Sequence, residues 1–504
     1  MDIGNIFEEW DFSGTVPLPH RVLLMGCIGI FAWGSNIHIL SHLRVDVSNL
    51  LFSSPPLFGI YTNHPRHARD RNVNKSTPLS APLSALYRSI YTLGVAFLVM
   101  VLVNMWMYKW VVAGSEAGGQ RNTGGSTVPT GKEMKGGMGL TGNPRAGIMV
   151  PIFGYLTVLI MIFVPFNILF KKERYRFLRS MRKALFSGFK SEVTFADVIL
   201  ADILTSFARV FGDLAVSLCL MFLDRDGTNP DACYGSIVVP IMTSIPYLIR
   251  LRQCLSEYIE SNYTTGRHLM NALKYSSAFP VIIVSAMQKS SKAASLKGLQ
   301  YDGYFTDNSL FKLWLFFVAL NSLYSFYWDI YHDWNLIQTY SVSSSPGTPP
   351  NGAIPMSDLS KQANGGSGAS NSATGSSHSS PLVNGGGVKQ QRLGMRSYLH
   401  YEYPSFYVMA VVLDFLLRTT WILKLVSNIQ IEEYEGGVFT MECLEVLRRW
   451  IWVLFRMESE MVKRAGYIDA DAAPFSHSGV GGEAPMVGDG ASNSDMIMME
   501  EWQK

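Results

Sequence analysis

The sequence predicts an all-α, polytopic membrane protein, and three observations support that fold class. The 504 residues are 48% hydrophobic and only 16% charged, and their mean hydropathy is +0.14, which is too apolar for an ordinary soluble protein of this length. Apolar runs of roughly 20 residues, the length that crosses the hydrocarbon core as a helix, recur along the chain. Polar stretches rich in Gly, Ser and Thr separate some of these runs, as linkers do.

The apolar runs predict about 8 to 10 transmembrane helices, some of them short or interrupted by charge. They lie near residues 20–41, 88–112, 147–170, 194–223, 235–254, 275–288, 309–330, 405–428 and 438–456. The first run follows an acidic segment, which is the reverse of the basic start of a signal peptide. We therefore expect the first run to remain in the protein as a span.

Composition also divides the chain into predicted domains. They are an acidic N-terminus (1–19), a first group of transmembrane helices (20–192) with a Gly-rich loop (113–146) and a basic loop (171–190), a second transmembrane domain (193–465) with a disordered insert (341–392), and a disordered tail (466–504). The Gly-rich loop, the insert and the tail cannot bury enough apolar surface to offset the entropy of ordering them. The basic loop is expected to face the cytosol, where Lys and Arg are enriched. A specific role for it in binding lipid or phosphate is a weaker interpretation.

Charge and cysteine content exclude several classes of function. The net charge is only +3, and the basic residues do not form the footprint of a nucleic-acid-binding protein. The five cysteines are scattered without the spacing of a metal site, so we expect them to be small packing residues. No nucleic-acid partner, metal, cofactor or catalytic group is therefore predicted, and the protein is not expected to be an enzyme.

Three arginines lie in a tryptophan-rich segment, 445–460, that otherwise resembles a membrane span: Arg448, Arg449 and Arg456. A guanidinium at bilayer depth costs on the order of 3 kcal/mol, so it is kept only where it faces a partner, a ligand or the interior of a bundle. The planar fork of arginine also matches tetrahedral oxyanions. We predict that Arg448 and Arg449 bind an anion and that Arg456 is structural.

Other charged residues of the second half fall at helical spacings. One set stands at i, i+3, i+7 and i+11, which would place it on one helix face turned away from lipid: Asp202, Thr205, Arg209 and Asp213. The others are Asp329 and Asp333 one turn apart, Asp414 and Arg418 as an i, i+4 pair, and Arg250, Arg252 and Lys274 at the ends of apolar runs. Structural ion pairs are the favoured interpretation for Arg252 and Asp213. The remaining bases together are expected to need more negative charge than the local acids supply, which again predicts an anionic ligand.

These residues stand in motifs that closely resemble, in order, the EXS domain, the membrane domain of the eukaryotic phosphate exporters. The motifs are PYLIRLRQCL (246–255), LMNALKYSS (269–277), YWDIYHDW (327–334), DFLLRTTW (414–421) and EVLRRWIWVLFRME (445–458). The resemblance covers about 195–465 and, more weakly, the earlier spans. Any one motif is weak, but the ordered set is specific.

The resemblance implies a set of phosphate contacts and a gate at matching positions of this sequence. The contacts are Asp202, Arg250, Lys274, Asp329, Asp333, Arg418, Arg448 and Arg449, with Trp421 as the candidate gate. Thr205 stands where the exporters carry asparagine, and its hydroxyl can still donate to phosphate. The exporters also carry a long cytosolic SPX domain before the first span, where this chain has about 20 acidic-rich residues. This layout is similar to the fungal Golgi branch, named for defective retention of endoplasmic-reticulum proteins.

The resemblance therefore predicts a protein that passes inorganic phosphate across the Golgi membrane from lumen to cytosol, which supports glycosylation and protein retention. Glycosylation releases phosphate in the Golgi, and that phosphate must leave. The bases would replace the water shell of the anion. The aspartates would accept hydrogen bonds from phosphate hydroxyls and so favour hydrogen phosphate over sulfate. Several weak contacts suit conduction better than one tight cage.

Two other functions compete with transport. The first is a membrane interaction protein that retains or recycles Golgi residents, binding glycosyltransferase tails or coat-associated proteins through the basic loop or the disordered segments. The second is a transferase acting on lipid-linked sugar, with Asp329 and Asp333 as metal ligands. The sequence also leaves open the oligomeric state, a homodimer included, the choice between channel and carrier, and the orientation. Counting three spans before the basic loop places the N-terminus in the lumen, whereas the SPX-bearing relatives hold it in the cytosol.

Overall fold

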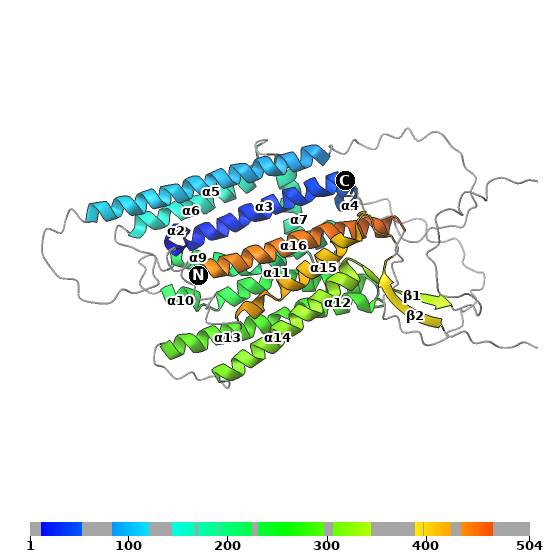
Figure 1. Ribbon diagram of the computed structural model, residues 1–504. Helices are drawn as coiled ribbons and strands as arrows, with labels where there is room; N and C mark the ends of the chain where they lie inside the picture. Colours follow the sequence, from blue (N-terminus) through cyan, green and yellow to red (C-terminus); the bar gives the residue numbers. More distant parts are fainter. Residues whose placement is uncertain are drawn as a thin grey trace, which may run out of the picture.

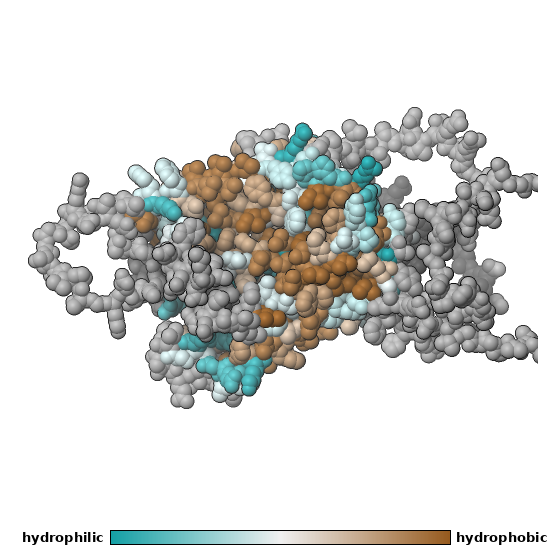
Figure 2. Space-filling model, in the orientation of Figure 1, coloured by the Kyte–Doolittle hydropathy of each residue, from teal (hydrophilic) through white to brown (hydrophobic). Residues whose placement is uncertain are grey.

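The computed structural model describes residues 12–52, 83–119, 144–166, 170–189, 191–223, 230–296, 306–343, 389–396, 398–424 and 435–466. Within them, long helices run side by side in a bundle, and a small sheet lies at one end (Figure 1). Hydrophobic residues gather over the middle of the visible face, and hydrophilic ones lie toward its ends (Figure 2). The prediction of an all-α polytopic membrane protein is confirmed.

The helices carry the labels of Figure 1. They are α2 (Phe12–Thr15), α3 (Leu18–His42), α4 (Val47–Phe52), α5 (Leu83–Gly119), α6 (Pro144–Phe163), α7 (Lys171–Phe186), α8 (Phe195–Ser206), α9 (Ala208–Phe222), α10 (Pro230–Tyr234), α11 (Val238–Glu260), α12 (Gly266–Ser276), α13 (Ala278–Leu296), α14 (Asp307–Trp328), the π-helix η1 (Asp329–Asp333), α15 (Pro404–Arg418), the 3-10 helix η3 (Thr420–Lys424) and α16 (Glu435–Arg464). Six helical segments of the described residues are long and apolar enough to cross a membrane, or seven if the bent pair α8 and α9 counts as one span. The described residues thus hold fewer such segments than the roughly 8 to 10 that the sequence predicts. The apolar α6 is shorter, and α16 carries charge along its 30 residues.

The helix predicted across residues 194–223 is broken, so the prediction that one face carries four polar residues is wrong. α8 begins with a capping box, in which Thr194 and Asp197 satisfy each other's backbone donors. At Phe207 the backbone leaves the helical region, with φ −96° and ψ 6°, and α9 continues at an angle of 60° to α8. The Phe207 ring packs against Gly29 of α3, where a Cβ atom would lie only 2.6 Å from it. Asp202 and Thr205 therefore belong to one helix, and Arg209 and Asp213 to another.

A two-stranded antiparallel sheet stands where the sequence predicted the start and end of a disordered insert. β1 (Ile337–Ser343) pairs with β2 (Lys389–Met395), in a register that runs from Ile337↔Met395 to Ser343↔Lys389. The insert therefore leaves and re-enters the fold through adjacent residues. The rest of the predicted insert, 344–388, lies outside the described residues.

The sheet is joined to the bundle by a buried ion pair. Arg396, just after β2, donates to both carboxylate oxygens of Glu458 in α16, and these residues are 3% and 1% exposed. The Tyr407 hydroxyl donates to the same carboxylate over 2.9 Å. The pair lies beside the main apolar core, which contains the fully buried Trp334 and Trp452.

Three local predictions also need correction. The helix α5 continues to Gly119, past residue 113, where the Gly-rich loop was predicted to begin. The predicted basic loop is mostly the helix α7. Cys219 and Cys233 form a disulfide rather than serving as separate packing residues. The remainder of the Gly-rich loop, 120–143, and the tail from 467 lie outside the described residues.

Candidate functional site

The predicted site residues meet inside the second half of the bundle, although they come from six elements: α8, α11, α12, η1, α15 and α16. Hydrogen bonds, ion pairs and ring contacts join them into one continuous network. Most members are less than a tenth exposed. Their burial confirms that these charged residues face the interior of the bundle and not lipid.

Asp202 of α8 lies at the centre of one part of the network. Its Oδ1 atom accepts from Nε of Arg250 over 2.9 Å and from the hydroxyl of Tyr275 over 2.5 Å. The Arg250 guanidinium also lies 4.8 Å from the centre of the Tyr275 ring and donates to Gln253 over 2.6 Å. One carboxylate thus holds two helices, α11 and α12, in fixed positions.

Lys274 of α12 lies between the two carboxylates of the π-helix. Its Nζ atom is 3.4 Å from Asp333 Oδ2 and 3.9 Å from Asp329 Oδ1. The π-turn is closed by the amide of Trp334, which donates to the carbonyl of Asp329 over 2.8 Å. A π-turn widens the helix by one residue and is frequent at functional sites. An ammonium therefore meets both acids, where the transferase interpretation required a metal ion.

Two arginines from different helices share Asp329. Arg418 of α15 donates to it and, over 3.0 Å, to Asp414. Arg448 of α16 lies 3.7 Å from Asp329 and 3.5 Å from Asp414. Arg448 also forms a two-pronged contact with Glu445, at 3.0 and 2.5 Å. Asp414 and Arg418 are consequently not an isolated i, i+4 pair.

Arg449 is held differently from the other arginines of the site. Its Nε donates to the Ser206 hydroxyl over 3.0 Å and its Nη2 to the Thr205 hydroxyl over 3.1 Å. Its guanidinium lies 4.5 Å from the centre of the Trp452 ring. Hydroxyls can turn and exchange partners more readily than carboxylates, because they carry no charge that must stay compensated. Arg449 thus differs from Arg418 and Arg448, whose described partners are carboxylates.

The central bases of the network lie among nearly as many acids as bases, and whether a ligand anion is needed for charge stays a prediction. The five basic members are Arg250, Lys274, Arg418, Arg448 and Arg449, and the five acidic members are Asp202, Asp329, Asp333, Asp414 and Glu445. This count is for the part of the chain that the structure describes. At the edge of the network Asp333 also lies 4.0 Å from Arg456, and an anion entering the network would compete with carboxylates for most of these bases.

Trp421, the candidate gate, lies outside this network. It stands in η3, one helical step beyond Arg418, and its ring meets Trp314 of α14 edge-on at 6.4 Å. It packs in an apolar cluster with Val284 and Leu310. Its position next to the charged network fits a gate, and that role stays a prediction.

Sequence reasoning missed several members of the network. Tyr275 and Ser206 are direct chain neighbours of predicted residues, and Glu445 precedes Arg448 by one helical turn. Gln253 has no charge and gave no signal. Tyr275, Ser206 and Glu445 could have been found from their closeness in sequence to predicted site residues. Which residue each of them bonds to depends on helix packing and could not be read from the sequence.

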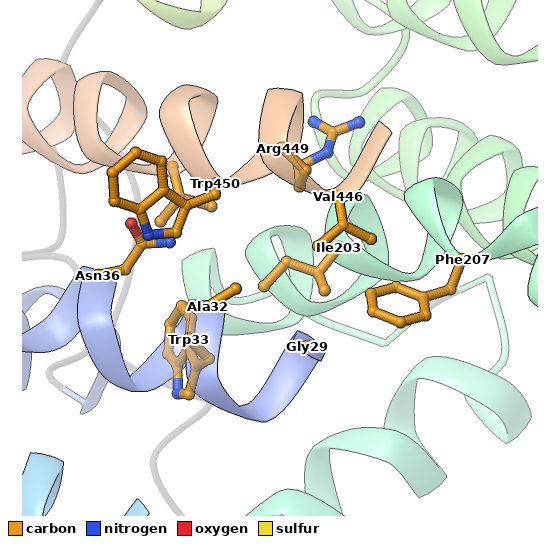
Figure 3. A pocket seen from close by; sticks show the side chains of 10 residues that line it. Gly29, Ala32, Trp33, Asn36, Ile203, Phe207, Val446, Arg449 and Trp450 are labelled. Atoms are coloured by element: carbon orange, nitrogen blue, oxygen red, sulfur yellow. The ribbon is translucent and has the colours of Figure 1, made fainter. Parts of the chain in front are cut away.

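A small cavity borders the charged network at Arg449. It lies between α3, α8 and α16 and has a volume of about 20 Å³, enough for one water molecule. Figure 3 shows Trp33, Asn36 and Trp450 around it, while the guanidinium of Arg449 points away. This cavity is too small for phosphate.

Comparison with known proteins identifies one family over most of the chain. A model of the EXS family matches residues 16–462. The chain is 24% identical to Protein ERD1 homolog 1 of Schizosaccharomyces pombe, over 91% of this chain and 94% of that protein. It is 27% identical to Protein ERD1 of Kluyveromyces lactis, over 53% and 58% of the two chains. It is 24% identical to Solute carrier family 53 member 1 of Mus musculus, over 65% of this chain and 42% of that protein.

Proposed function

This chain belongs to the EXS family, and on that premise we propose that it transports inorganic phosphate across a membrane of the secretory pathway. The observation that carries the proposal is the charged network, in which five bases and five acids lie inside a membrane bundle. A purely structural role does not explain so many buried charges, because apolar residues of similar volume often stabilise a fold as well or better.

The network suggests how an anion would be bound and released. Arg449 would exchange its two hydroxyl partners for phosphate oxygens, and Lys274 would exchange its long contacts of 3.4 and 3.9 Å. The carboxylates would take back the bases as the anion leaves. Because the carboxylates compete with phosphate for the same bases, the anion is not trapped, which is what conduction requires.

The acids would also give selectivity. Hydrogen phosphate carries a hydroxyl that can donate to a carboxylate such as Asp333 or Asp202, whereas sulfate at neutral pH carries none. A carboxylate facing sulfate would be a repulsive contact, and specificity often depends on such contacts.

Two independent observations support an orientation in the membrane. The disulfide between Cys219 and Cys233 lies at the end of the bundle where α9 meets α10, beside Leu18 at the start of α3. Disulfides form in the oxidising lumen. The basic helix α7 connects the far ends of α6 and α8, and clusters of this kind face the cytosol. The start of α3 would then be lumenal and the β1–β2 sheet cytosolic.

We further propose that the membrane is that of the Golgi and that net movement of phosphate is from lumen to cytosol, as the resemblance of the motifs to the SPX-less fungal branch implies. Glycosylation releases phosphate in that lumen, and its removal would keep the reaction running. Retention of resident proteins would then be an indirect consequence of transport.

Phosphate flux in proteoliposomes tests the proposal. The purified protein should carry radiolabelled phosphate and should carry sulfate much more slowly, and Arg448→Ala with Arg449→Ala should abolish the flux. Arg464→Ala, at the end of the same helix, is the matched control. Equal flux in the double variant and the wild type, at equal protein abundance, contradicts the proposal.

The competing function is an interaction protein that recycles Golgi residents without transport. The exposed basic helix α7 favours it, as a surface for the acidic tails of such proteins. It leaves the buried charged network without a role. A protein without flux that still binds glycosyltransferase tails would establish this alternative.

A further inference from the structure

The helix α7 has a basic face that no part of the proposed transport uses. Lys172, Arg179 and Arg182 are all exposed, and their positions place them on one side of the helix. The opposite side carries Met181 and Ala184, which pack against α8 and α11. The basic face therefore points away from the bundle.

Both ends of α7 are fixed to neighbouring helices. Near its start, the buried Arg174 donates to the carbonyls of Met161 and Val164 at the end of α6, each over 2.9 Å. At its end, Arg252 of α11 donates to the carbonyl of Ala184 over 2.6 Å. Cations at helix C-termini satisfy carbonyls that have no partner within their own helix. The basic face is thus held in a set position at the end of the bundle.

Large apolar side chains are also exposed on α7, and two of them, Phe177 and Leu185, lie away from the basic residues around the helix. Phe177 is 45% exposed, Leu185 43% and Phe186 81%. A soluble acidic peptide or a free phosphate would leave these side chains in water, whereas a bilayer interface would bury them. Basic amphipathic helices with exposed aromatic residues lie in that interface and attract anionic lipids.

We propose that α7 binds the headgroups of anionic phospholipids in the cytosolic leaflet. Lys172, Arg179 and Arg182 contact the lipid phosphates, and Phe177 and Leu185 lie among the upper parts of the acyl chains.

A chain of contacts connects α7 to the charged network, so bound lipid also tunes the phosphate site. Lys183 of α7 lies 2.6 Å from Asp197 of α8. The carbonyl of Asp197 accepts from Gln253 over 3.2 Å, and Gln253 accepts from Arg250 over 2.6 Å. These contacts give lipid bound at α7 a route to Arg250. This second step rests on the proposed function, whereas lipid binding does not.

Binding is tested with the full-length protein in phosphatidylcholine nanodiscs and a fluorescent short-chain phosphatidylinositol 4-phosphate as the probe. The variant Lys172→Gln, Arg179→Gln, Arg182→Gln should bind it roughly 100-fold more weakly, at about a fivefold loss for each charge. The control Lys109→Gln, Lys292→Gln, Lys312→Gln removes three exposed charges from the opposite end of the bundle and should bind normally. Equal binding in both variants overturns the proposal.

A second arm identifies the source of the phosphate group. The water-soluble inositol phosphate headgroup, without acyl chains, should bind much more weakly than the lipid, and raised salt should weaken lipid binding. Equal affinity for the soluble headgroup shows a site for a free anion and overturns the lipid assignment. This arm uses the wild-type protein and does not depend on the folding of a variant.

Coupling is tested by phosphate flux in proteoliposomes with and without anionic lipid. Anionic lipid should lower KM for phosphate severalfold in the wild type and leave it unchanged in the α7 variant. An unchanged or higher KM in the wild type overturns the coupling. A protein that binds lipid but shows no flux at all leaves lipid binding standing and refutes the transport function instead.

Discussion

The guanidinium of Arg449 donates to the hydroxyl of Thr205 over 3.1 Å, and this bond joins α16 to the last turn of α8. Beyond that turn the chain breaks at Phe207. An anion that takes Arg449 would release a contact at this break. The charged network and the break between α8 and α9 therefore meet at the same point of the fold.

Arg449→Ala should lower phosphate affinity roughly 10- to 100-fold, because hydrogen bonds to charged groups contribute about 1.5–3 kcal/mol. Arg449→Lys should recover part of the loss, since the charge returns without the planar fork. Concentration-dependent flux in proteoliposomes gives both values. Normal KM and normal maximal flux for Arg449→Ala would remove this residue from the pathway.

Replacing Asp414 and Arg418 together by leucines should leave the protein folded and inactive. The net charge is unchanged, and buried ion pairs can often be replaced by apolar residues without loss of stability. Arg418 also donates to Asp329, however, so its loss removes a base from the network. Vesicle uptake of phosphate at equal abundance is the measurement, and full activity would show that Arg418 is only structural.

Tyr275→Phe should raise KM for phosphate severalfold with little change in folding. The ring would keep its place beside Arg250 and Lys274, each 4.8 Å away, while the 2.5 Å hydrogen bond to Asp202 would be lost. Tyr324→Phe, which loses a hydrogen bond to the carbonyl of Met270, is the matched control. If the two variants have the same KM, the hydroxyl of Tyr275 does not position Asp202.

Deleting residues 344–388 and closing β1 and β2 with a short turn should leave transport intact. Ser343 and Lys389 are paired neighbours, so a tight turn can join them. A longer deletion that also removes both strands should reduce stability, because Arg396 would lose its fixed place beside Glu458. Phosphate flux and thermal stability, measured for both deletion variants, separate an effect on transport from an effect on stability. Loss of flux in the variant that lacks only residues 344–388, at normal abundance, would show that the insert is a functional element.

Cys219→Ser should lower the free energy of unfolding by about 3 kcal/mol, the value expected for a closed loop of roughly 15 residues. In sealed Golgi vesicles, a reductant that cannot cross the membrane should not expose Cys219 and Cys233 to alkylation, because the disulfide is placed in the lumen. After the membrane is permeabilised, the same reductant should expose both. Alkylation in sealed, correctly oriented vesicles would reverse the orientation proposed above.

The residues of the charged network could be predicted from sequence, because a charge in an apolar run is expensive and therefore conspicuous. Arg448 and Arg449 were identified in this way, and the ordered EXS motifs added Lys274 and Arg250. The spans were predicted for the same reason, since about 20 apolar residues in a row have few other uses. A charge within an apolar run and the length of that run are both local features, because each lies within a single helix.

The partners of those charges were decided by the tertiary structure alone. Asp329 meets Arg418 from α15 and Arg448 from α16 because a π-turn and two helix packings bring them together, and no periodicity along the chain encodes that meeting. The balance of acids and bases, the break where Phe207 packs on Gly29, and the disulfide of Cys219 with Cys233 are likewise long-range relationships. Sequence determined which side chains must be kept away from lipid, and only packing decided which of them face one another.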